Sequence, residues 1–449
     1  MNIPPETKPS PVLATARTKQ GGDASRRLAG AEPAVWTERM LIALTRGLEG
    51  NQWFRLIDKV YADRTLEQAW EKVQSNAGGR GVDRITIERF AKDCPRGLLD
   101  LKEFCWPAER TARSQPLPVK RVWIPKPGTN QKRPLGIPAV RDRIVQTALR
   151  MVIEPIFEHH FAEHSYDFRP GLGCKDALRR VQTLLDEGCT WIVDADLKSY
   201  FDTIPKDRLM RRVEERLADG RVLALLRSYL EQEVMEELTK HDPTDRGTPQ
   251  GAVISPLLAN IYLDPLDHLL ADSGVEMIRY ADDFVLLCRS EEAAQAALVR
   301  GQTWVEENGL TLPPEKTRLV DVTQPGGFDF LGYHFERKYR WPRRKAMDRL
   351  KDKVRELTPR TSGHSREATI TRLNQMLRGW FGYFQYSHRT TFPRIDGYVR
   401  GRLRSILRQR AGKRGRARGT DHPQWRNHYF TELGLFSLTQ AQVLARQSR

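Results

Sequence analysis

The sequence of 449 residues is poor in cysteine and has no long apolar run. Its five cysteines are odd in number and none forms a Cys-x-x-Cys pair, which argues against both a zinc site and a disulfide framework. No apolar stretch approaches the roughly 18 residues of a membrane span. The N-terminal segment also lacks the apolar core of a signal peptide. We therefore expect a cytoplasmic protein with no membrane partner.

Acidic residues are scarce in the C-terminal part of the chain. The formal net charge of the whole chain is +17 and its pI is near 9.8. From residue 337 onward, 28 lysines and arginines stand against 7 aspartates and glutamates, a net charge of +21, so residues 1–336 carry −4. A basic excess of this size favours a nucleic-acid partner. Its position indicates that much of the binding surface lies after residue 336.

Two adjacent carboxylates, Asp282 and Asp283, interrupt an otherwise apolar stretch. The runs before and after the pair have the β-rich character of buried strands, so the pair is expected at the tip of a hairpin. Two neighbouring anions at such a joint need a counter-charge, and a hard divalent cation supplies it to oxygen ligands. An Asp-Asp pair is also ordinary turn chemistry, so the pair alone leaves both interpretations open.

A second acidic strand lies upstream, where Asp194 and Asp196 interrupt the apolar run of residues 191–197. Two such strands can bring carboxylates to a pair of magnesium ions, the usual device for in-line displacement at phosphorus. Phosphoryl transfer, and specifically nucleotide polymerisation, is therefore the leading hypothesis. Because side chains alternate along a strand, Asp194 and Asp196 point to the same face, and spacing alone does not separate them.

The motif YADD at residues 280–283, with DLKSYF at residues 196–201, resembles the palm of a reverse transcriptase. Further blocks resemble, in order, segments of the enzyme encoded by group II introns: RPLGIPAVRDRIVQTAL (133–149), HSYDFRPGLGCKDAL (164–178), GTPQGAVISPLLANIYLDPLD (247–267), GLTLPPEKTRLV (309–320) and FDFLGYHF (328–335). Two later segments resemble the maturase domain of that family: GWFGYFQYS (379–387) and HPQWRNHYFTELGLFSL (422–438). The resemblance covers almost all of residues 35–440. With no cysteine pairs of the kind found in the family's endonuclease domain, the chain resembles the endonuclease-lacking type.

The resemblance implies an α+β right-hand polymerase, with fingers and a palm that holds a small antiparallel sheet, followed by an all-α thumb. The expected domains are an N-terminal extension with fingers (34–160), a palm (161–336) and a thumb with maturase domain (337–449). Residues 1–33 lack periodicity and are expected to be a disordered tail. The implied function is RNA-directed DNA polymerisation, in which dNTPs are added to a primer 3′-hydroxyl by two-metal phosphoryl transfer. The family also implies a maturase that binds intron RNA to promote splicing and mobility.

The catalytic set implied by the resemblance is Asp196, Asp282 and Asp283. The resemblance selects Asp196 over Asp194 because Asp196 opens the DLKSYF block. Two Mg²⁺ ions are expected, with Asp196, Asp282 and the backbone carbonyl of Leu197 as ligands. Asp283 is expected to support the geometry of the site.

The resemblance also implies residues that contact the nucleotide. Phe201 stands where reverse transcriptases keep a bulky ring, which excludes a 2′-hydroxyl and so selects deoxynucleotides; an ordinary core phenylalanine is the alternative. Lys126 and Arg133 stand where the family grips the triphosphate, and Lys132 could take the place of Arg133. Solvated surface charge is the alternative for these basic residues.

Four further positions have implied roles around the templating base pair and the primer. Gln250 and Gly251 resemble the turn beneath the templating pair, where a glycine permits close backbone approach. Lys316 resembles the lysine on the nucleotide side, and Gly332 resembles the primer grip. Three other family positions have no assigned role, since helix capping or a buried ion pair would explain each: Asn260, Arg169 and Asp202.

The C-terminal part of the chain is predicted to be helical and basic. Apolar residues recur at helical spacing from 370 to 384 and again from 395 to 410, and these stripes are expected to pack. The basic residues among them are expected to bind RNA: Arg402, Arg404, Arg408, Arg410, Lys413 and Arg414. For residues 411–419 a solvated, flexible segment is the alternative.

The expected partners are intron RNA as template, a DNA primer or target and dNTPs, in a nucleoid-associated ribonucleoprotein. Formation of a homodimer is left open by the sequence. Two other functions are considered. One is an RNA-binding splicing cofactor without polymerase activity, which the intact acidic triad disfavours. The other is a domesticated reverse transcriptase of host defence or of a CRISPR system, which the maturase-like C-terminal part disfavours.

Overall fold

In the computed structural model of this protein, the chain forms two compact units, each with most of its contacts inside itself. The first unit contains Met1–Ala162, Phe168–Gly171 and Ser199–Asp264, and the second contains Glu163–Asp167, Leu172–Lys198 and Pro265–Arg449. The structure describes residues 30–46, 52–105, 115–125, 132–236, 239–241, 245–248, 251–361, 363–413 and 415–447. Most of the expected disordered tail, together with Lys126, Gln250 and Arg414, lies outside the described residues. The expected domain boundaries stay predictions.

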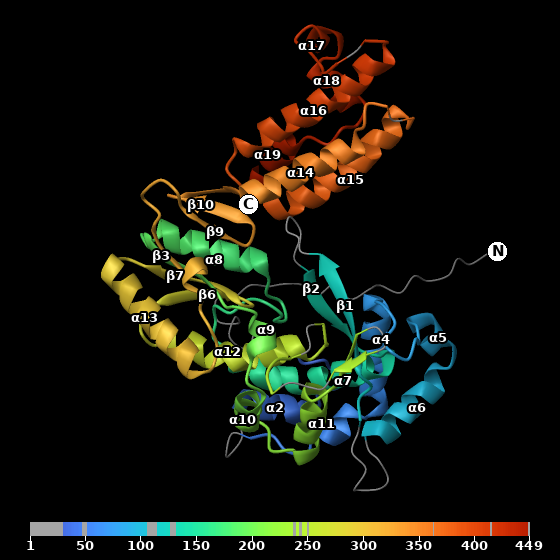
Figure 1. Ribbon diagram of the computed structural model, residues 1–449, viewed down its shortest axis with the longest axis vertical. Coiled ribbons are helices and arrows are strands. Elements are labelled where there is room, and N and C mark those ends of the chain that lie inside the picture. Colours follow the sequence, from blue (N-terminus) through green and yellow to red (C-terminus); the bar gives the residue numbers. More distant parts are fainter. Residues whose placement is uncertain are drawn as a thin grey trace, which may run out of the picture. The chain divides into compact units, whose positions relative to one another are not determined.

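The first unit is mainly helical and contains one small sheet (Figure 1). Its helices are α2 (Glu38–Arg46), α3 (Ile57–Val60), α4 (Asp63–Asn76), α5 (Ile87–Lys92), α6 (Cys94–Cys105), α7 (Val140–Glu158), α9 (Tyr200–Thr203), α10 (Lys206–Glu214) and α11 (Gly220–Leu230). Its strands are β1 (Val119–Pro125), β2 (Lys132–Ile137), β4 (Val234–Glu236) and β5 (Thr239–His241), in the order β2-β1-β4-β5. Strand β1 pairs antiparallel with β2 and parallel with β4.

Helix α7 forms the centre of the first unit and packs against α3, α4 and α6. Its residues are buried on nearly all sides, the polar ones included. Gln146 accepts hydrogen bonds from the backbone N–H of Val253, at 2.8 Å, and Arg143 donates to the carbonyls of Ala77 and Gly79. Buried polar groups need such partners, because an unpaired one costs about 1–3 kcal/mol. The Arg143 bonds tie α7 to the glycine-containing segment that follows α4, and the Gln146 bond ties it to the segment that precedes α12.

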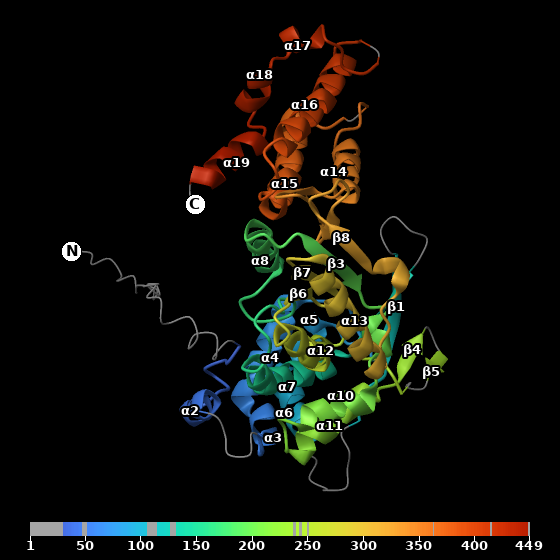
Figure 2. The same cartoon turned by 90° about the vertical axis from the view of Figure 1, so that its left-hand side faces the viewer.

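The second unit contains the sheet that carries both acidic motifs (Figure 2). The sheet order is β6-β7-β3-β8, and every neighbouring pair is antiparallel. The strands are β6 (Glu276–Tyr280), β7 (Asp283–Cys288), β3 (Trp191–Asp196) and β8 (Arg318–Asp321). Helix α8 (Cys174–Asp186) packs against β6 and β7, and α13 (Glu291–Glu307) packs against β7, β3 and β8. Helix α12 (Ser255–Ala271) begins in the first unit and ends in the second, and a short 3₁₀ helix, η1 (Pro314–Lys316), precedes β8.

A three-stranded antiparallel sheet follows in the chain, in the order β11-β10-β9. Its strands are β9 (Phe328–Phe330), β10 (Tyr333–Glu336) and β11 (Tyr339–Pro342). One face is aromatic and fully buried, since Phe328, Phe330, Tyr333 and Phe335 join a hydrophobic cluster with α8 and the acidic sheet. Residues at alternate positions, such as His334, lie on the other face.

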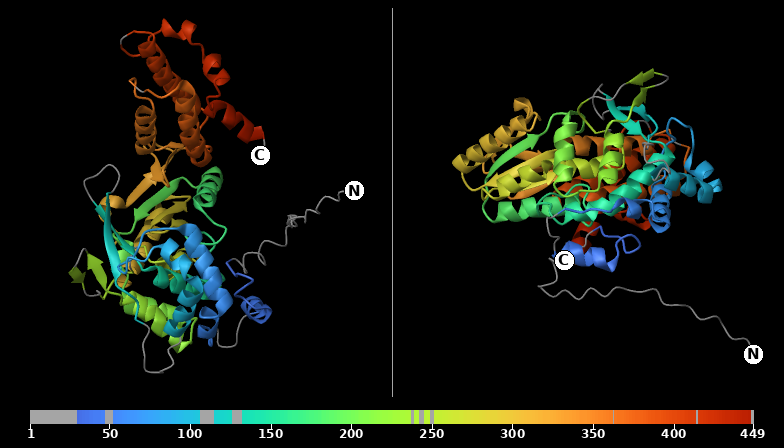
Figure 3. Two further views of the ribbon diagram at one scale, coloured as in Figure 1. Left: turned by 90° about the vertical axis from the view of Figure 1, so that its right-hand side faces the viewer. Right: turned by 90° about the horizontal axis from the view of Figure 1, so that it is seen from below.

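The last part of the second unit is entirely helical, seen as the orange and red segment in Figure 3. Its helices are α14 (Arg344–Leu357), α15 (Arg366–Phe384), α16 (Thr391–Arg410), α17 (Asp421–Gln424), α18 (Asn427–Glu432) and α19 (Leu438–Gln447). The predicted apolar stripes are confirmed, because Leu373, Leu377, Val399 and Leu403 share one buried cluster. The carboxylate of Asp396 in α16 accepts from the backbone N–H at the start of α19, which fixes that helix to α16.

The predicted α+β class, with small antiparallel sheets and a helical C-terminal region, is confirmed. The sheet of the first unit adds one parallel pair, between β1 and β4. Across the described residues, no helix combines the length and apolar character needed to cross a membrane.

Candidate active site at the acidic hairpin

The predicted hairpin is formed by β6 and β7, which are joined by the two-residue loop Ala281–Asp282. Tyr280 pairs with Asp283 at the end of the ladder. Ala281 has φ of +58°, in the left-handed region that two-residue hairpin loops favour. For a residue with a Cβ this conformation costs roughly 1–2 kcal/mol. The loop that presents Asp282 is therefore held in place by its surroundings.

Strand pairing brings the upstream acids to the hairpin. Asp196 lies directly opposite Asp283, and Asp194 lies opposite Val285 on the same strand pair. Directly paired residues share a face of the sheet, so Asp194, Asp196 and Asp283 lie on one face. The backbone N–H of Leu197 donates to the carbonyl of Asp282, at 3.2 Å, and joins the end of β3 to the turn.

The gathered carboxylates carry more negative charge than the site neutralises. Burial, together with the charges of Asp194, Asp196 and Asp282, raises the pKa of Asp283 to about 8. Burial also raises the pKa of Asp194, an effect that the guanidinium of Arg318 opposes. A site that disfavours its own carboxylate anions in this way suits a cation as partner.

Two basic side chains already accompany the acids. The Nζ of Lys316 is ion-paired with Asp196, and Nη2 of Arg318 lies 2.6 Å from Oδ2 of Asp194. In the described part of the chain, no three His, Cys, Asp or Glu side chains are placed to share one metal ion. The donor set nevertheless fits a hard divalent cation in its chemistry, because it consists of carboxylate and backbone oxygens. Lys316 supplies positive charge at the carboxylate that the resemblance assigns to metal.

Gly332 lies in the turn between β9 and β10, with φ of +79°. A Cβ at this position would lie 3.8–3.9 Å from the rings of Tyr383 and Phe384. There is therefore room for a side chain at this position, but the positive φ disfavours any residue other than glycine. This turn of the three-stranded sheet lies next to aromatic side chains of α15.

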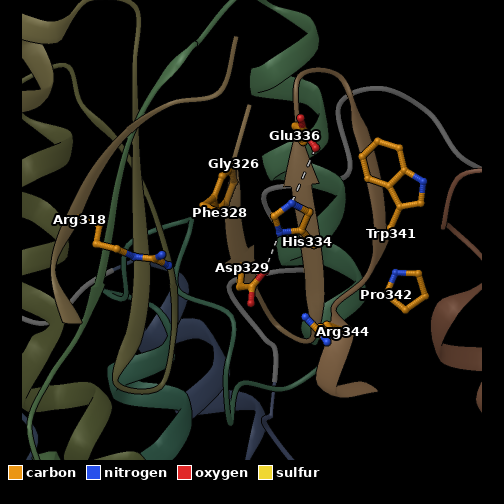
Figure 4. Close-up of a pocket in the computed structure, with 10 residues that line it drawn as sticks. Arg318, Gly326, Phe328, Asp329, His334, Glu336, Trp341, Pro342 and Arg344 are labelled. Carbon is orange, nitrogen blue, oxygen red and sulfur yellow. Dashed lines mark hydrogen bonds and ion pairs between the residues drawn. The ribbon is translucent and has the colours of Figure 1, made fainter. Parts of the chain in front are cut away.

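A pocket of about 560 Å³, with several charged side chains in its lining, lies on the exposed face of the three-stranded sheet (Figure 4). His334 stands at its centre, with Nδ1 2.8 Å from a carboxylate oxygen of Asp329 and Nε2 4.0 Å from Glu336. Trp341 lines the pocket from β11, directly across the ladder from His334. Arg318, the partner of Asp194, lines its other side, so the pocket adjoins the acidic face.

The other residues predicted to contact the nucleotide belong to the first unit. Arg133 is exposed in β2, opposite Ile124, and Phe201 is half-buried in α9. Gly251 has φ of +103°, and a Cβ there would collide with the carbonyl oxygen of Gly136. This close approach between the glycine turn and β2 supports the predicted need for glycine.

The predicted RNA-binding residues fall into two groups. Arg410 and Lys413 are exposed, as RNA contacts should be. Arg404 is only 2% exposed and donates to the carbonyl of Trp425 and to Asn427. The prediction of an RNA contact therefore does not suit Arg404, because its guanidinium is used inside the helical segment.

The neighbouring arginines also have internal partners. Arg402 donates to the hydroxyl and carbonyl of Thr358, and Arg408 pairs with the buried carboxylate of Asp421 at 2.9 Å. Arg410 donates to the carbonyl of His364 while staying exposed. Side-chain direction along α16 does not reveal these partners, which come from residues 421–427 for Arg404 and Arg408 and from residues 358 and 364 for Arg402 and Arg410.

The structure also places four residues to which the sequence assigned no role. Arg169 forms a buried ion pair with Glu158, one of the alternatives considered for it. Asn260 is buried within α12, and Asp202 lies in α9. Arg279, in the strand that leads to the acidic pair, is 1% exposed and ion-paired with Asp267. Its place just before YADD was the available signal, but periodicity could not reveal the partner.

Two family models match this chain. The reverse transcriptase (RNA-dependent DNA polymerase) model matches residues 124–335, which include every predicted catalytic residue. The model of the group II intron maturase-specific domain matches residues 347–425, which correspond to α14 through α17. The two matches follow each other in the order that the sequence motifs predicted.

Individual relatives agree with the family models. Protein YkfC of Escherichia coli is 38% identical, over 50% of this chain and 68% of that protein. Group II intron-encoded protein LtrA of Lactococcus lactis is 33% identical, over 45% of this chain and 33% of that protein. The uncharacterized 91 kDa protein in the cob intron of Schizosaccharomyces pombe is 29% identical, over 60% of this chain and 44% of that protein. The chain thus spans about two thirds of the first relative and less than half of the other two.

Proposed function

This chain belongs to the family of group II intron reverse transcriptases and maturases, and from that premise we propose that it is an RNA-directed DNA polymerase. It extends a primer 3′-hydroxyl with dNTPs on an RNA template. One observation carries the proposal: Asp196 and Asp283 lie opposite each other on one face of the sheet, with Asp282 in the adjoining turn. This arrangement suits phosphoryl transfer, in which the protein mainly positions groups and neutralises charge.

The acidic face is the proposed magnesium site. Asp196, Asp282 and the carbonyl of Leu197 would hold two Mg²⁺ ions, which when bound would activate the attacking hydroxyl and stabilise the leaving pyrophosphate. Asp283, half-buried and directly opposite Asp196, has a pKa that burial and the neighbouring carboxylates raise to about 8, and a bound cation would favour its ionised form. Lys316 provides a point charge suited to a triphosphate beside Asp196.

Residues of the first unit are proposed to select the nucleotide. Arg133, with Lys126 or Lys132, would bind the triphosphate, and the ring of Phe201 would exclude a 2′-hydroxyl. Gln250 and Gly251 would support the templating pair. The φ of +103° at Gly251, where a Cβ would meet β2, supports this assignment.

The helical segment is proposed to bind intron RNA and to provide maturase function, so that the protein works as a ribonucleoprotein. The net charge of +21 after residue 336 supports this proposal. Arg410 and Lys413, together with the exposed basic residues of α14, are the proposed contacts. The internally bonded Arg404 instead maintains the fold of the segment.

The proposed active site is tested with Asp282→Ala. We expect primer extension on an RNA template to fall by at least about 100-fold, because a ligand of the reacting groups is lost. RNA affinity should stay nearly unchanged, since it is spread over many basic contacts. Asp272→Ala, at an exposed aspartate just after α12, is the matched control and should leave extension unchanged.

The outcomes separate the candidate functions. Undiminished extension by Asp282→Ala would remove the acidic hairpin from catalysis. If the parent protein binds intron RNA tightly but extends no primer with Mg²⁺ or Mn²⁺, the chain is an RNA-binding splicing cofactor instead.

A further inference from the structure

The side chain of Arg279 lies on the reverse side of the acidic hairpin. In the ladder between β6 and β7, Arg279 is opposite Phe284, whereas Tyr280 is opposite Asp283. Because successive residues of a strand point to opposite faces, Arg279 lies on the face away from the carboxylate of Asp283. The guanidinium is 1% exposed. Its hydrogen bond to the acidic turn is made to a backbone group, the carbonyl of Ala281.

Two groups anchor the guanidinium. Its Nε lies 2.8 Å from Oδ1 of Asp267 and its Nη2 lies 2.6 Å from Oδ2, so the pair is bidentate. The same Nη2 donates to Oγ of Ser165, at 2.7 Å. Asp267, in α12, is itself only 3% exposed. Charge-assisted bidentate bonds of this kind are strong and directional, so the arginine head has one orientation.

The remaining nitrogen reaches the catalytic turn. Nη1 of Arg279 donates to the carbonyl of Ala281, at 3.1 Å. Ala281 has φ of +58°, which a residue with a Cβ adopts only when its surroundings hold it there. The next residue is Asp282. The arginine thus connects a rigid helix to the peptide that sets the direction of this carboxylate.

The backbone of Arg279 is held as well. Its N–H donates to the carbonyl of His164 and its carbonyl accepts from the N–H of Tyr166, both at 3.0 Å. Strand β6 lies at the edge of the sheet, and residues 164–166 cover that edge next to the turn. The main chain and the side chain of Arg279 therefore together immobilise the end of β6, just before the turn.

We propose that Arg279 is a positioning residue for nucleotide addition: anchored by Asp267 and Ser165, it holds the Ala281–Asp282 turn in the geometry that metal binding requires. The inference rests on the proposed polymerase function. The proposed role requires the planar guanidinium of arginine, because this group donates hydrogen bonds to three partners in different directions at once. A lysine at this position keeps the charge but cannot supply the fork.

The chain contains a matched control for this arrangement. Arg169 is also buried, donates in bidentate fashion to Glu158, and donates to a backbone carbonyl, that of Ala162. Arg169 shares with Arg279 a bidentate carboxylate and a backbone carbonyl as partners, but the carbonyl it holds follows α7 instead of belonging to the acidic hairpin. Arg169→Lys therefore introduces the same chemical change in a buried ion pair outside the hairpin.

The test compares Arg279→Lys and Arg169→Lys with the parent protein. We expect Arg279→Lys to lower kcat for dNTP addition by about 10- to 100-fold, with KM for dNTP nearly unchanged. Binding of Mn²⁺, followed by electron paramagnetic resonance without substrates, should weaken by roughly 10-fold or more. Arg169→Lys should change neither quantity. Circular dichroism at the assay temperature establishes that both variants are folded.

A second variant tests the route through the turn. Glycine adopts positive φ without the Cβ penalty, so Ala281→Gly should lessen the need for the arginine. In a double-mutant cycle, Arg279→Lys should cost clearly less kcat in the Ala281→Gly protein than in the parent. Coupling of this kind supports action through Ala281.

Three results would overturn the inference. They are an unchanged Mn²⁺ affinity in Arg279→Lys, a loss of kcat no larger than that of Arg169→Lys, and full additivity with Ala281→Gly. Each presupposes an active parent protein, so these results differ from failure of the polymerase proposal, in which the parent itself extends no primer.

Discussion

Phe201 has a ring orientation that its neighbours decide. The ring packs edge-on against Tyr200, with ring centres 5.6 Å apart, and the Tyr200 hydroxyl donates to the carbonyl of Ala259 at 2.6 Å. Tyr200 is 1% exposed, whereas Phe201 is half-buried. We expect Phe201→Val to lower the preference for dNTP over rNTP by roughly 10- to 100-fold, because the bulk that meets the 2′-hydroxyl is removed.

Single-nucleotide incorporation with each dNTP and rNTP measures this preference as a ratio of kcat/KM values. Phe201→Tyr keeps the ring and should keep the preference. If Phe201→Val discriminates as well as the parent, another residue excludes the 2′-hydroxyl and Phe201 is part of the core.

Helix α16 shows that an arginine-rich helix can be mainly structural. Arg404 donates at 2.9 Å to the carbonyl of Trp425 and at 2.8 Å to Asn427, and its guanidinium lies over the ring of Phe430. We expect Arg404→Gln to lower the free energy of unfolding by about 2–3 kcal/mol, since buried acceptors lose a charged donor. Under conditions in which the protein is folded, its RNA affinity and salt dependence should match those of the parent.

Urea unfolding followed by tryptophan fluorescence measures the stability, and filter binding measures the affinity. Arg394→Gln, at an exposed position of the same helix, is the control and should change stability by less than about 0.5 kcal/mol. A loss of RNA affinity in Arg404→Gln without a loss of stability would return this residue to the RNA-binding surface.

Charge is divided unevenly over the whole molecule, with +21 after residue 336 and −4 before it. Each phosphate contact releases counterions, so log affinity falls with log salt by about 0.7–0.9 per contact. Neutralising three exposed residues of α14, Arg344, Lys345 and Arg349, should therefore reduce the slope by about 2–3. Titration of intron RNA over a salt series provides the measurement.

The matched control neutralises three exposed basic residues of the first unit, Arg64, Arg89 and Lys92. Its net charge changes equally, so it separates direct contact from a general electrostatic effect. Equal reductions of the slope in both triple variants would mean that the RNA senses the total charge and that α14 is no specific surface.

The sequence by itself determined the local features of this protein. Period-two alternation placed Asp194 and Asp196 on one face of a strand, and the observed register confirms it. Helical spacing identified the buried stripes of α15 and α16. Order and type of the motifs were enough to indicate the family and its acidic hairpin. These features depend on neighbours a few residues apart, which is what periodicity measures.

Only the tertiary structure decided which charges meet. Lys316 reaches Asp196 across 120 positions of sequence and Arg318 reaches Asp194 across 124, because β3 and β8 are adjacent in the sheet. The burial of Arg404 likewise depends on a segment that folds back over α16. Helical or strand periodicity states which way a side chain points, but not what covers it. Partners of charged groups are set by strand order and helix packing, and these emerge only when the chain is folded.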